Sequence, residues 1–299
     1  MMKFNQLMLM LFAILAASIV VSAQDVVNDQ LLRQKMEMAA ENLTNYTYSR
    51  SAEADLLFKN ASILKDFRAH KSTEGKVDLV NQSGSWNSNL TDEESNKVLT
   101  WDGYYINGTE YWKADKNWAK LNRNNTTQIM GDLDELPGQI CLCKYSDMKI
   151  VGTESLQGEE YYKLVGSPIE SIDMGIIGQQ LLAAYFPSPF SLPEKLKNGT
   201  LDIDSTSLMN NSNIVMTAWV SKNTSLLRKL DINSSLIITP KILGISSPDF
   251  RIESRFNEST VYNNFDSPLE IELPKEAQKA PTRNLATNWR WSVFGSVRP

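Results

Sequence analysis

The chain has 299 residues, with 30 Lys and Arg against 35 Asp and Glu, a formal net charge of −5 and a pI of about 5.2. A composition of 42% hydrophobic and 22% charged residues allows a buried core and excludes disorder over the whole length. The acidic balance argues against a nucleic-acid partner, because phosphate binding requires clustered Lys and Arg. The one histidine, His70, argues against a histidine-rich metal site and a histidine-based triad, and we expect no metal and no cofactor.

The N-terminus is typical of a secretory signal peptide over residues 1–23. Lys3 supplies the positive charge, Leu7 to Val21 is an apolar run, and Val21-Ser22-Ala23 offers small residues for cleavage before Gln24. The alternative is an N-terminal membrane anchor, but the run is short against the roughly 20 residues of a membrane span. We therefore expect export, with the protein extracellular or at the cell surface and soluble after cleavage.

The first predicted element of the mature chain is an amphipathic helix. Asn28 is a suitable N-cap, and the apolar residues that follow recur at helical spacing on one face. This face consists of Leu32, Met36, Ala39, Ala40 and Leu43. We expect it to be a packing face.

The pattern then changes to the period of two that is typical of β-strands. From Tyr48 to Phe58 the even positions are mostly apolar and the odd positions mostly polar, which predicts a strand with one wet face. Further strands are predicted at Val77–Val80, Gly103–Ile106, Glu110–Lys113, Trp118–Leu121, Tyr161–Val165, Ile214–Val220, Leu226–Ile238 and Phe250–Tyr262. Asn107-Gly108 between two of them is a strong hairpin signal, so the pattern favours an antiparallel meander.

Two more helices are predicted between the strands. Ile169 to Phe186 carries apolar residues at helical spacing and is stopped by Pro187, while Thr127–Ile140 is a weaker prediction of a short helix. No linker divides the rest of the chain. We expect a single domain over residues 24–280 and a C-terminal tail over 281–299.

Cys141 and Cys143 are the two cysteines, separated by one residue. Positions i and i+2 of a strand lie about 6.5–7 Å apart, at the edge of disulfide reach, so a bridge between them would need a bent backbone. A strained disulfide, two separate thiols, and an intermolecular or metal contact all stay open.

Acceptor sequences for N-glycosylation occur three times more often than expected. Thirteen Asn-X-Ser/Thr sequons are present, whereas chance placement of the 25 Asn and 47 Ser and Thr predicts about 4. The acceptors are Asn42, Asn45, Asn60, Asn81, Asn89, Asn107, Asn124, Asn125, Asn198, Asn210, Asn223, Asn233 and Asn257. We favour glycosylation at some of these sites, on an archaeal-type surface protein, over a mere abundance of polar turns.

Residues that would indicate an enzyme are missing from the pattern. Neither a glycine-rich phosphate loop nor a Gly-X-Ser-X-Gly elbow is present, and acidic clusters such as Asp132/Asp134/Glu135 are typical of solvated turns. We predict no catalytic residue and no enzymatic activity. Six aromatic residues between Trp101 and Trp118 indicate cross-strand packing, with a sugar or lipid platform as the alternative.

The order of elements resembles the LolA-like superfamily of lipoprotein carriers and LppX-type lipid-binding lipoproteins, over about residues 28–278. The resemblance rests on a helix leading into Asn42-Leu-Thr-Asn-Tyr-Thr-Tyr and on the segment beginning at Ile150-Val-Gly-Thr-Glu. It rests further on Ala218-Trp-Val-Ser-Lys and on Ile271-Glu-Leu-Pro near the end.

The resemblance implies an α+β fold, an unclosed β-barrel made of a strongly bent antiparallel sheet with helices covering its concave face. It also implies an apolar interior for a lipid or other hydrophobic ligand, with the 169–186 helix as a lid. Under this interpretation the ligand contacts are Leu32, Met36, Ile172, Ile176, Ile177, Leu181, Leu182, Tyr185 and Phe186. LppX-type members carry a lipid-anchoring Cys where this chain has Gln24, which puts a lipoprotein identity in doubt.

Two functions follow from the sequence. The first is a binding protein that holds a hydrophobic ligand beneath the lid, with an envelope or membrane-surface partner for loading. The alternative is a structural or interaction protein of the cell envelope that has no small ligand. A packed interior would contradict the first.

Overall fold

The computed structural model describes residues 28–59, 66–94, 96–114, 117–122, 135–156, 158–168, 207, 210–242 and 251–282. Within these ranges eleven strands form one sheet, and every neighbouring pair is antiparallel. The strands are β1 (Asn45–Lys59), β2 (Phe67–Asp78), β3 (Ser83–Asp92), β4 (Lys97–Ile106), β5 (Thr109–Ala114), β6 (Asn117–Asn122), β7 (Lys149–Leu156), β8 (Glu159–Gly166), β9 (Ser212–Ser221), β10 (Leu227–Ile238) and β11 (Arg251–Asn263). The predicted antiparallel architecture is confirmed.

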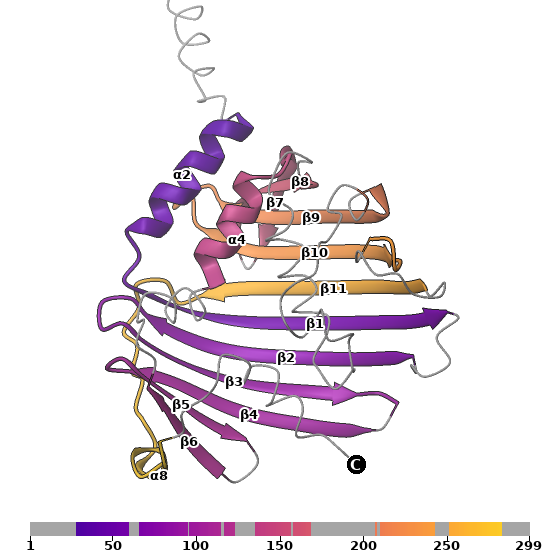
Figure 1. Cartoon of the computed structure of the whole chain (residues 1–299). Coiled ribbons are helices and arrows are strands. Elements are labelled where there is room, and N and C mark those ends of the chain that lie inside the picture. The colour runs from indigo at the N-terminus through magenta and orange to yellow at the C-terminus, as the bar shows by residue number, and fades with distance from the viewer. Residues whose placement is uncertain are drawn as a thin grey trace, which may run out of the picture.

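The sheet consists of two meanders that meet at its two central strands. Its order is β6-β5-β4-β3-β2-β1-β11-β10-β9-β8-β7, so β1 pairs with β11 from the other end of the chain. Figure 1 shows the strands fanning and curving across this order. The two ends of the order, β6 and β7, do not pair with each other, which leaves the barrel unclosed as predicted.

Local chemistry explains where the hairpins turn. Asn107 and Gly108 have φ of 53° and 75° between β4 and β5, the left-handed conformation that a type I′ turn requires. After β2, the side chain of Asp78 accepts the backbone N–H of Asn81 at 2.9 Å, and Gln82 takes a φ of 46°. The strand predicted at Val77–Val80 therefore begins earlier and ends at Asp78.

Two strands were not predicted from the sequence. β3 is built mainly from Ser, Asn, Asp and Thr, and β7 is an edge strand with most of its residues exposed. Neither shows the hydrophobic alternation of a half-buried strand. They belong to the sheet because their backbones pair with neighbouring strands, β2 and β4 for one and β8 for the other.

Two helices cover one face of the sheet. α2 (Asp29–Glu41) begins at Asn28, whose side chain accepts the N–H of Leu31 at 2.7 Å, as expected of an N-cap. α4 (Glu135–Lys144) overlaps the helix predicted at Thr127–Ile140 over residues 135–140, and residues 127–134 lie outside the described residues. A short α8 (Lys275–Gln278) follows β11. In Figure 1, α4 lies across the β9–β10 part of the sheet with α2 beside it. We call the covered face the inner face and the opposite one the outer face.

Polar contacts fasten α2 to its surroundings. Arg33 donates to the carbonyl of Ser146 at 2.6 Å, and Lys144 lies 2.7 Å from Glu37. The carboxylate of Asp29 accepts the backbone N–H of Ile150, on β7, at 2.8 Å. The α2–α4 pair is therefore held as one unit against the β7 side of the sheet.

Candidate ligand-binding face

The inner face is strongly apolar along the central strands. In β1 the even residues point inward, and the same phase continues across β11 and β10 through the register of the sheet. Beneath α2 and α4 the side chains form one packed cluster, which includes Leu32 and Met36 at 1% exposure each. The structure thus places these two predicted contacts inside the packed core.

A second group of buried apolar residues lies on the inner face outside that cluster. Its members are aliphatic side chains and one phenylalanine from four neighbouring strands, namely Ala52, Leu56, Ala69, Leu236, Ile252 and Phe256. They extend the apolar surface toward the ends of β1 and β10, away from α2. The other predicted contacts, at 172–186, lie outside the described residues, as does the whole predicted lid.

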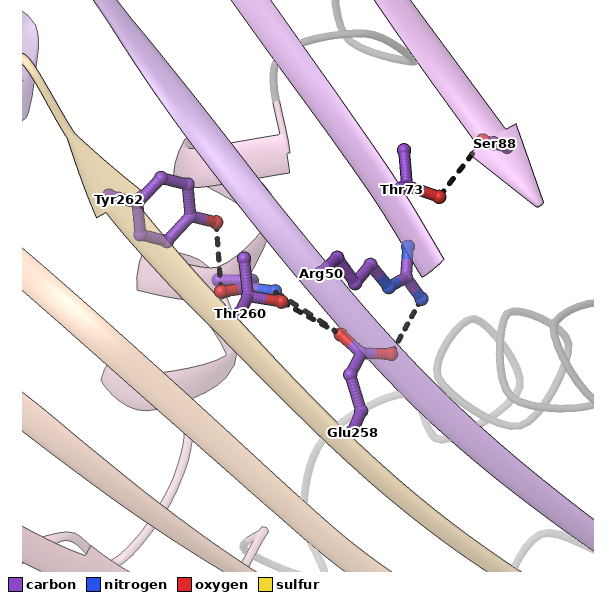
Figure 2. Close-up of polar contacts among 7 residues, drawn as sticks. Arg50, Thr73, Ser88, Glu258, Thr260 and Tyr262 are labelled. Carbon is purple, nitrogen blue, oxygen red and sulfur yellow. Dashed lines mark hydrogen bonds and ion pairs between the residues drawn. The ribbon is translucent and has the colours of Figure 1, made fainter. Parts of the chain in front are cut away.

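A charged pair stands in the middle of this face. Arg50 of β1 lies 2.6 Å from Glu258 of β11, and the side chains are 21% and 6% exposed. The backbone carries them inward because Arg50 is in phase with Tyr48 and Ala52, while Glu258 is in phase with Phe256. Figure 2 shows the pair lying across the two strands.

The carboxylate of Glu258 also joins α4 to the sheet. Its other oxygen accepts hydrogen bonds from the Gln139 amide and the Thr260 hydroxyl, both at 3.3 Å. The Gln139 amide also donates to Thr260 at 3.0 Å, and its carbonyl accepts the hydroxyl of Tyr262 at 2.8 Å. These contacts make Gln139 the polar link between α4 and β11.

The polar contacts continue across the sheet in a row. Five neighbouring strands contribute one residue each to a line of cross-strand partners, in the order Thr260, Arg50, Thr73, Ser88 and Trp101. Within this line the hydroxyls of Thr73 and Ser88 lie 2.9 Å apart. In the next row Lys71 faces Ala52, and its ammonium lies 5.5 Å from the centre of the Trp101 ring. We call the side chains of Arg50, Glu258, Thr260, Gln139, Thr73, Ser88 and Lys71 the polar row.

The sequence analysis did not single out the polar row. A signal was present, since Arg50 falls at an even position in β1, between the apolar Tyr48 and Ala52. A charged residue in the inward phase of a strand indicates a buried partner. Its partner Glu258 lies 208 residues away and is found only through the β1–β11 pairing.

Both cysteines lie on α4 and both are free. Positions i and i+2 of a helix point to different sides, so Cys141 is exposed while Cys143 is buried. Burial raises the pKa of the Cys143 thiol to about 12. The strained disulfide considered from the sequence is therefore wrong for this structure, because the segment is a helix and not a strand.

Sequon asparagines avoid the inner face wherever the structure describes them. Asn233 and Asn257 face each other across β10 and β11, both exposed on the outer face. Asn42, Asn81, Asn107, Asn210 and Asn223 are also exposed, and Asn45 and Asn89 are half-buried. Asn60, Asn124, Asn125 and Asn198 lie outside the described residues.

The structure also places the single histidine and the aromatic stretch considered from the sequence. His70 lies on β2, on the outer face, opposite Glu53 and Thr91. The aromatic stretch divides between the faces, with Trp101 and Trp112 inward and Tyr104 and Trp118 outward. Trp112 packs edge-on against Trp86 at 5.1 Å, and Tyr104 lies 5.9 Å from Trp118 across the strands. Among the described residues no group of three His, Cys, Asp or Glu side chains is placed to hold a metal ion.

Comparisons with known proteins return structural matches only. No protein-family model and no curated protein matches the chain. Mycobacterium tuberculosis lipoprotein LppX matches with 13% identity and a TM-score of 0.38, covering 82% of this chain and 98% of that one. LprF from Mycobacterium bovis matches with 15% identity and a TM-score of 0.41, covering 82% and 96%. LolA superfamily protein NE2245 from Nitrosomonas europaea matches with 13% identity and a TM-score of 0.22, covering 84% and 97%.

LppX and the LolA superfamily are the kinds of protein that the sequence resemblance named. Across the helices that the structure describes, none has the length and apolar character needed to cross a membrane. The described residues form an unclosed, curved antiparallel sheet with helices on one face (Figure 1).

Proposed function

We propose that the protein is an exported binding protein that holds a lipid or another hydrophobic ligand against the inner face of the sheet. The observation that carries this proposal is the extent of the apolar inner surface. It continues past the cluster beneath α2 and α4 to Leu56, Leu236 and Phe256. A surface of this kind, interrupted by a few polar groups, is typical of sites for small hydrophobic molecules.

The polar row gives the ligand an orientation. An ion pair buried in an apolar face is weak evidence for stability, because desolvation offsets most of its Coulomb attraction. Lys71 lies in the same cross-strand row as Glu258, and Arg50 lies in the next row, so both cations stand beside this carboxylate. An amphiphile would place its acidic or hydrogen-bonding end here and its hydrocarbon part along Leu56 and Phe256. The predicted lid residues between Ile172 and Phe186 remain part of this proposal as the opposite wall.

Export and glycosylation complete the proposed function. Signal cleavage after Ala23 is supported by the sequence of residues 1–23. Glycosylation is supported by position, since none of the nine described sequon asparagines is buried and none lies on the inner face. Glycans on the outer face and the turns would leave the inner face free for a ligand. We infer that the protein acts by binding and not by catalysis.

Binding of a fluorescent fatty acid tests the proposal. We expect delipidated protein to bind cis-parinaric acid, and to bind its methyl ester more weakly because the ester has no charge for the polar row. Lys71→Met should weaken binding of the acid at least threefold and leave the ester unchanged. The matched control is Lys76→Met, since Lys76 is exposed on the same strand but on the outer face. Failure of both probes to bind would contradict the proposed function and favour the structural role in the envelope.

A further inference from the structure

We propose that the outer face carries a second site, a groove across β1 to β4 that binds a neutral oligosaccharide. The groove has a volume of about 510 Å³. Most of its lining residues have the outward phase of their strands, which places it on the outer face, and the inward-phase residues Tyr48, Gly75 and Trp86 border it. It goes beyond the proposed function and does not depend on it. The side chains proposed to contact the sugar point outward, whereas the proposed ligand site on the inner face consists of inward-pointing side chains.

The register of the sheet builds the groove from two parallel rows of side chains. One row runs through Thr47, Lys76, Ser85 and Tyr104. The other runs through Ser49, Glu74, Asn87 and Asp102. Adjacent strands lie about 4.8 Å apart, so the groove extends roughly 19 Å from Asn263 on β11 to Tyr104 on β4. That length suits a short chain of sugar units lying across the strands.

The lining has the mixed chemistry that sugar hydroxyls require. It offers hydroxyls from Ser49 and Ser85, an amide from Asn87 and carboxylates from Glu74 and Asp102. The groove therefore offers both hydrogen-bond donors and acceptors, which suits a sugar because each of its hydroxyls can donate and accept. Glu74 and Asp102 outnumber Lys76 in the lining, and this negative balance disfavours a phosphate or another polyanion and favours an uncharged chain.

Aromatic side chains extend the groove at its β4 end. Tyr104 forms part of the groove wall and lies 5.9 Å from Trp118 of β6. Tyr111 is the direct cross-strand partner of Tyr104. Rings of this kind supply flat apolar surface beside polar groups, the combination on which the C–H face of a pyranose stacks.

Electrostatic contacts hold the aromatic end in place. Asp102 accepts a hydrogen bond from the Asn87 amide at 2.6 Å and lies 3.5 Å from Lys113. Lys113 in turn lies 5.7 Å from the centre of the Trp118 ring. Asp102 thereby links the polar groove to the aromatic surface, and the pair of features forms one continuous site.

The sequons border the groove without entering it. Asn45 lies one cross-strand row beyond Thr47, and Asn89 lies one row beyond Asn87. The asparagines that line the groove, Asn87 and Asn263, are not followed by Ser or Thr at the required position. Glycans attached at the sequons would flank the groove and leave it open to a ligand.

Filling the groove tests the site with little risk to folding. Ser49→Trp places a ring in the groove, and Ser51→Trp is its matched control, since Ser51 is exposed on the same face of β1 one row outside the lining. Neither change alters a sequon. We would titrate glycan-free protein, made in a bacterium without N-glycosylation, with neutral hexasaccharides of glucose, mannose, galactose and N-acetylglucosamine. The readouts are calorimetry and saturation-transfer NMR.

We expect at least one hexasaccharide to bind to the wild type and to the Ser51→Trp control. Ser49→Trp should weaken this binding at least tenfold, and Asp102→Asn should weaken it about tenfold. The natural ligand could be a free polysaccharide or a glycan on a second copy of the chain. If a glycan on a second copy is the ligand, glycosylated wild type self-associates in sedimentation velocity, and either Ser49→Trp or enzymatic deglycosylation abolishes the association. Absence of oligosaccharide binding together with absence of groove-dependent association would overturn the proposal, as would equal binding by both tryptophan variants.

Discussion

Removal of Arg50 tests whether the inner-face ion pair is as buried as the structure shows. Arg50→Met keeps most of the aliphatic length and deletes the guanidinium, which leaves Glu258 with its Gln139 and Thr260 donors but without its ion-pair partner. Breaking a buried ion pair on one side costs about 3–5 kcal/mol, because the remaining charge stays desolvated. Since Arg50 is 21% exposed, we expect the lower end, about 3 kcal/mol.

Urea unfolding, followed by far-UV circular dichroism and tryptophan fluorescence, measures this loss. The double variant Arg50→Met/Glu258→Gln should recover most of it, because the neutral amide no longer needs a counter-charge. Arg68→Met is the matched control, since Arg68 also pairs with a carboxylate, Asp55 at 2.7 Å, but is 61% exposed. It should cause no measurable change. A loss equal to that of the Arg68 control, or a double variant as unstable as the single one, would refute the reasoning.

Three further predictions follow from particular side chains. One thiol should react with Ellman's reagent in the native protein and a second only after unfolding, because Cys141 is exposed whereas burial raises the pKa of Cys143 to about 12; a disulfide would leave neither. Gly103→Ala should lower stability by about 1–3 kcal/mol in urea unfolding, although alanine is the better strand former, because its Cβ would overlap the ring of Trp86 that lies over Gly103. Burial and the Glu159 carboxylate raise the pKa of Tyr161 to about 12. Between pH 10 and 12 this phenol therefore ionises in the unfolded chain before it does so in the folded protein, and the free energy of unfolding falls. Tyr161→Phe should show a shallower fall in urea unfolding over the same pH range.

The local features of the fold were predictable from the sequence, and the reasons are physical. The alternation of polar and apolar side chains along β1 was sufficient to predict which of its residues point inward. The positive φ that Asn and Gly tolerate was sufficient to predict the turn at Asn107-Gly108. Asn233 and Asn257 fall at odd positions of strands whose even positions are buried, so the same alternation explains why both are exposed.

Features that depend on distant pairing were not predictable in the same way. β3 has no alternation of its own and becomes a strand by hydrogen bonding between β2 and β4. The segment with Cys141 and Cys143 was treated as a strand for the disulfide argument, but it packs as a helix with Ile140 and Cys143 in the core cluster. The polar row is assembled from β1, β2, β3, β11 and α4. The pattern of a single strand shows only that a polar residue occupies an inward position, not which residues it contacts.

The apolar interior of the site was expected from the family resemblance, whereas its polar centre was not. Leu32 and Met36 were selected from helical periodicity, which is the same for a residue that packs in a core and for one that contacts a ligand. The structure places both in the packed cluster, with Ile140 and Cys143. Under the proposed function, the side chains of the inner face that distinguish one ligand from another belong to the polar row, Arg50, Lys71 and Glu258 among them.

Native mass spectrometry of the mature, deglycosylated protein from its own host tests the central claim most directly. The account predicts a mass excess in the lipid range that is lost on denaturation, and Leu56→Trp, which fills the inner face, should reduce its occupancy relative to the outer-face control Ser51→Trp. A bare polypeptide mass in the wild type, with or without oligomers, would contradict the account and leave the inner face as ordinary core.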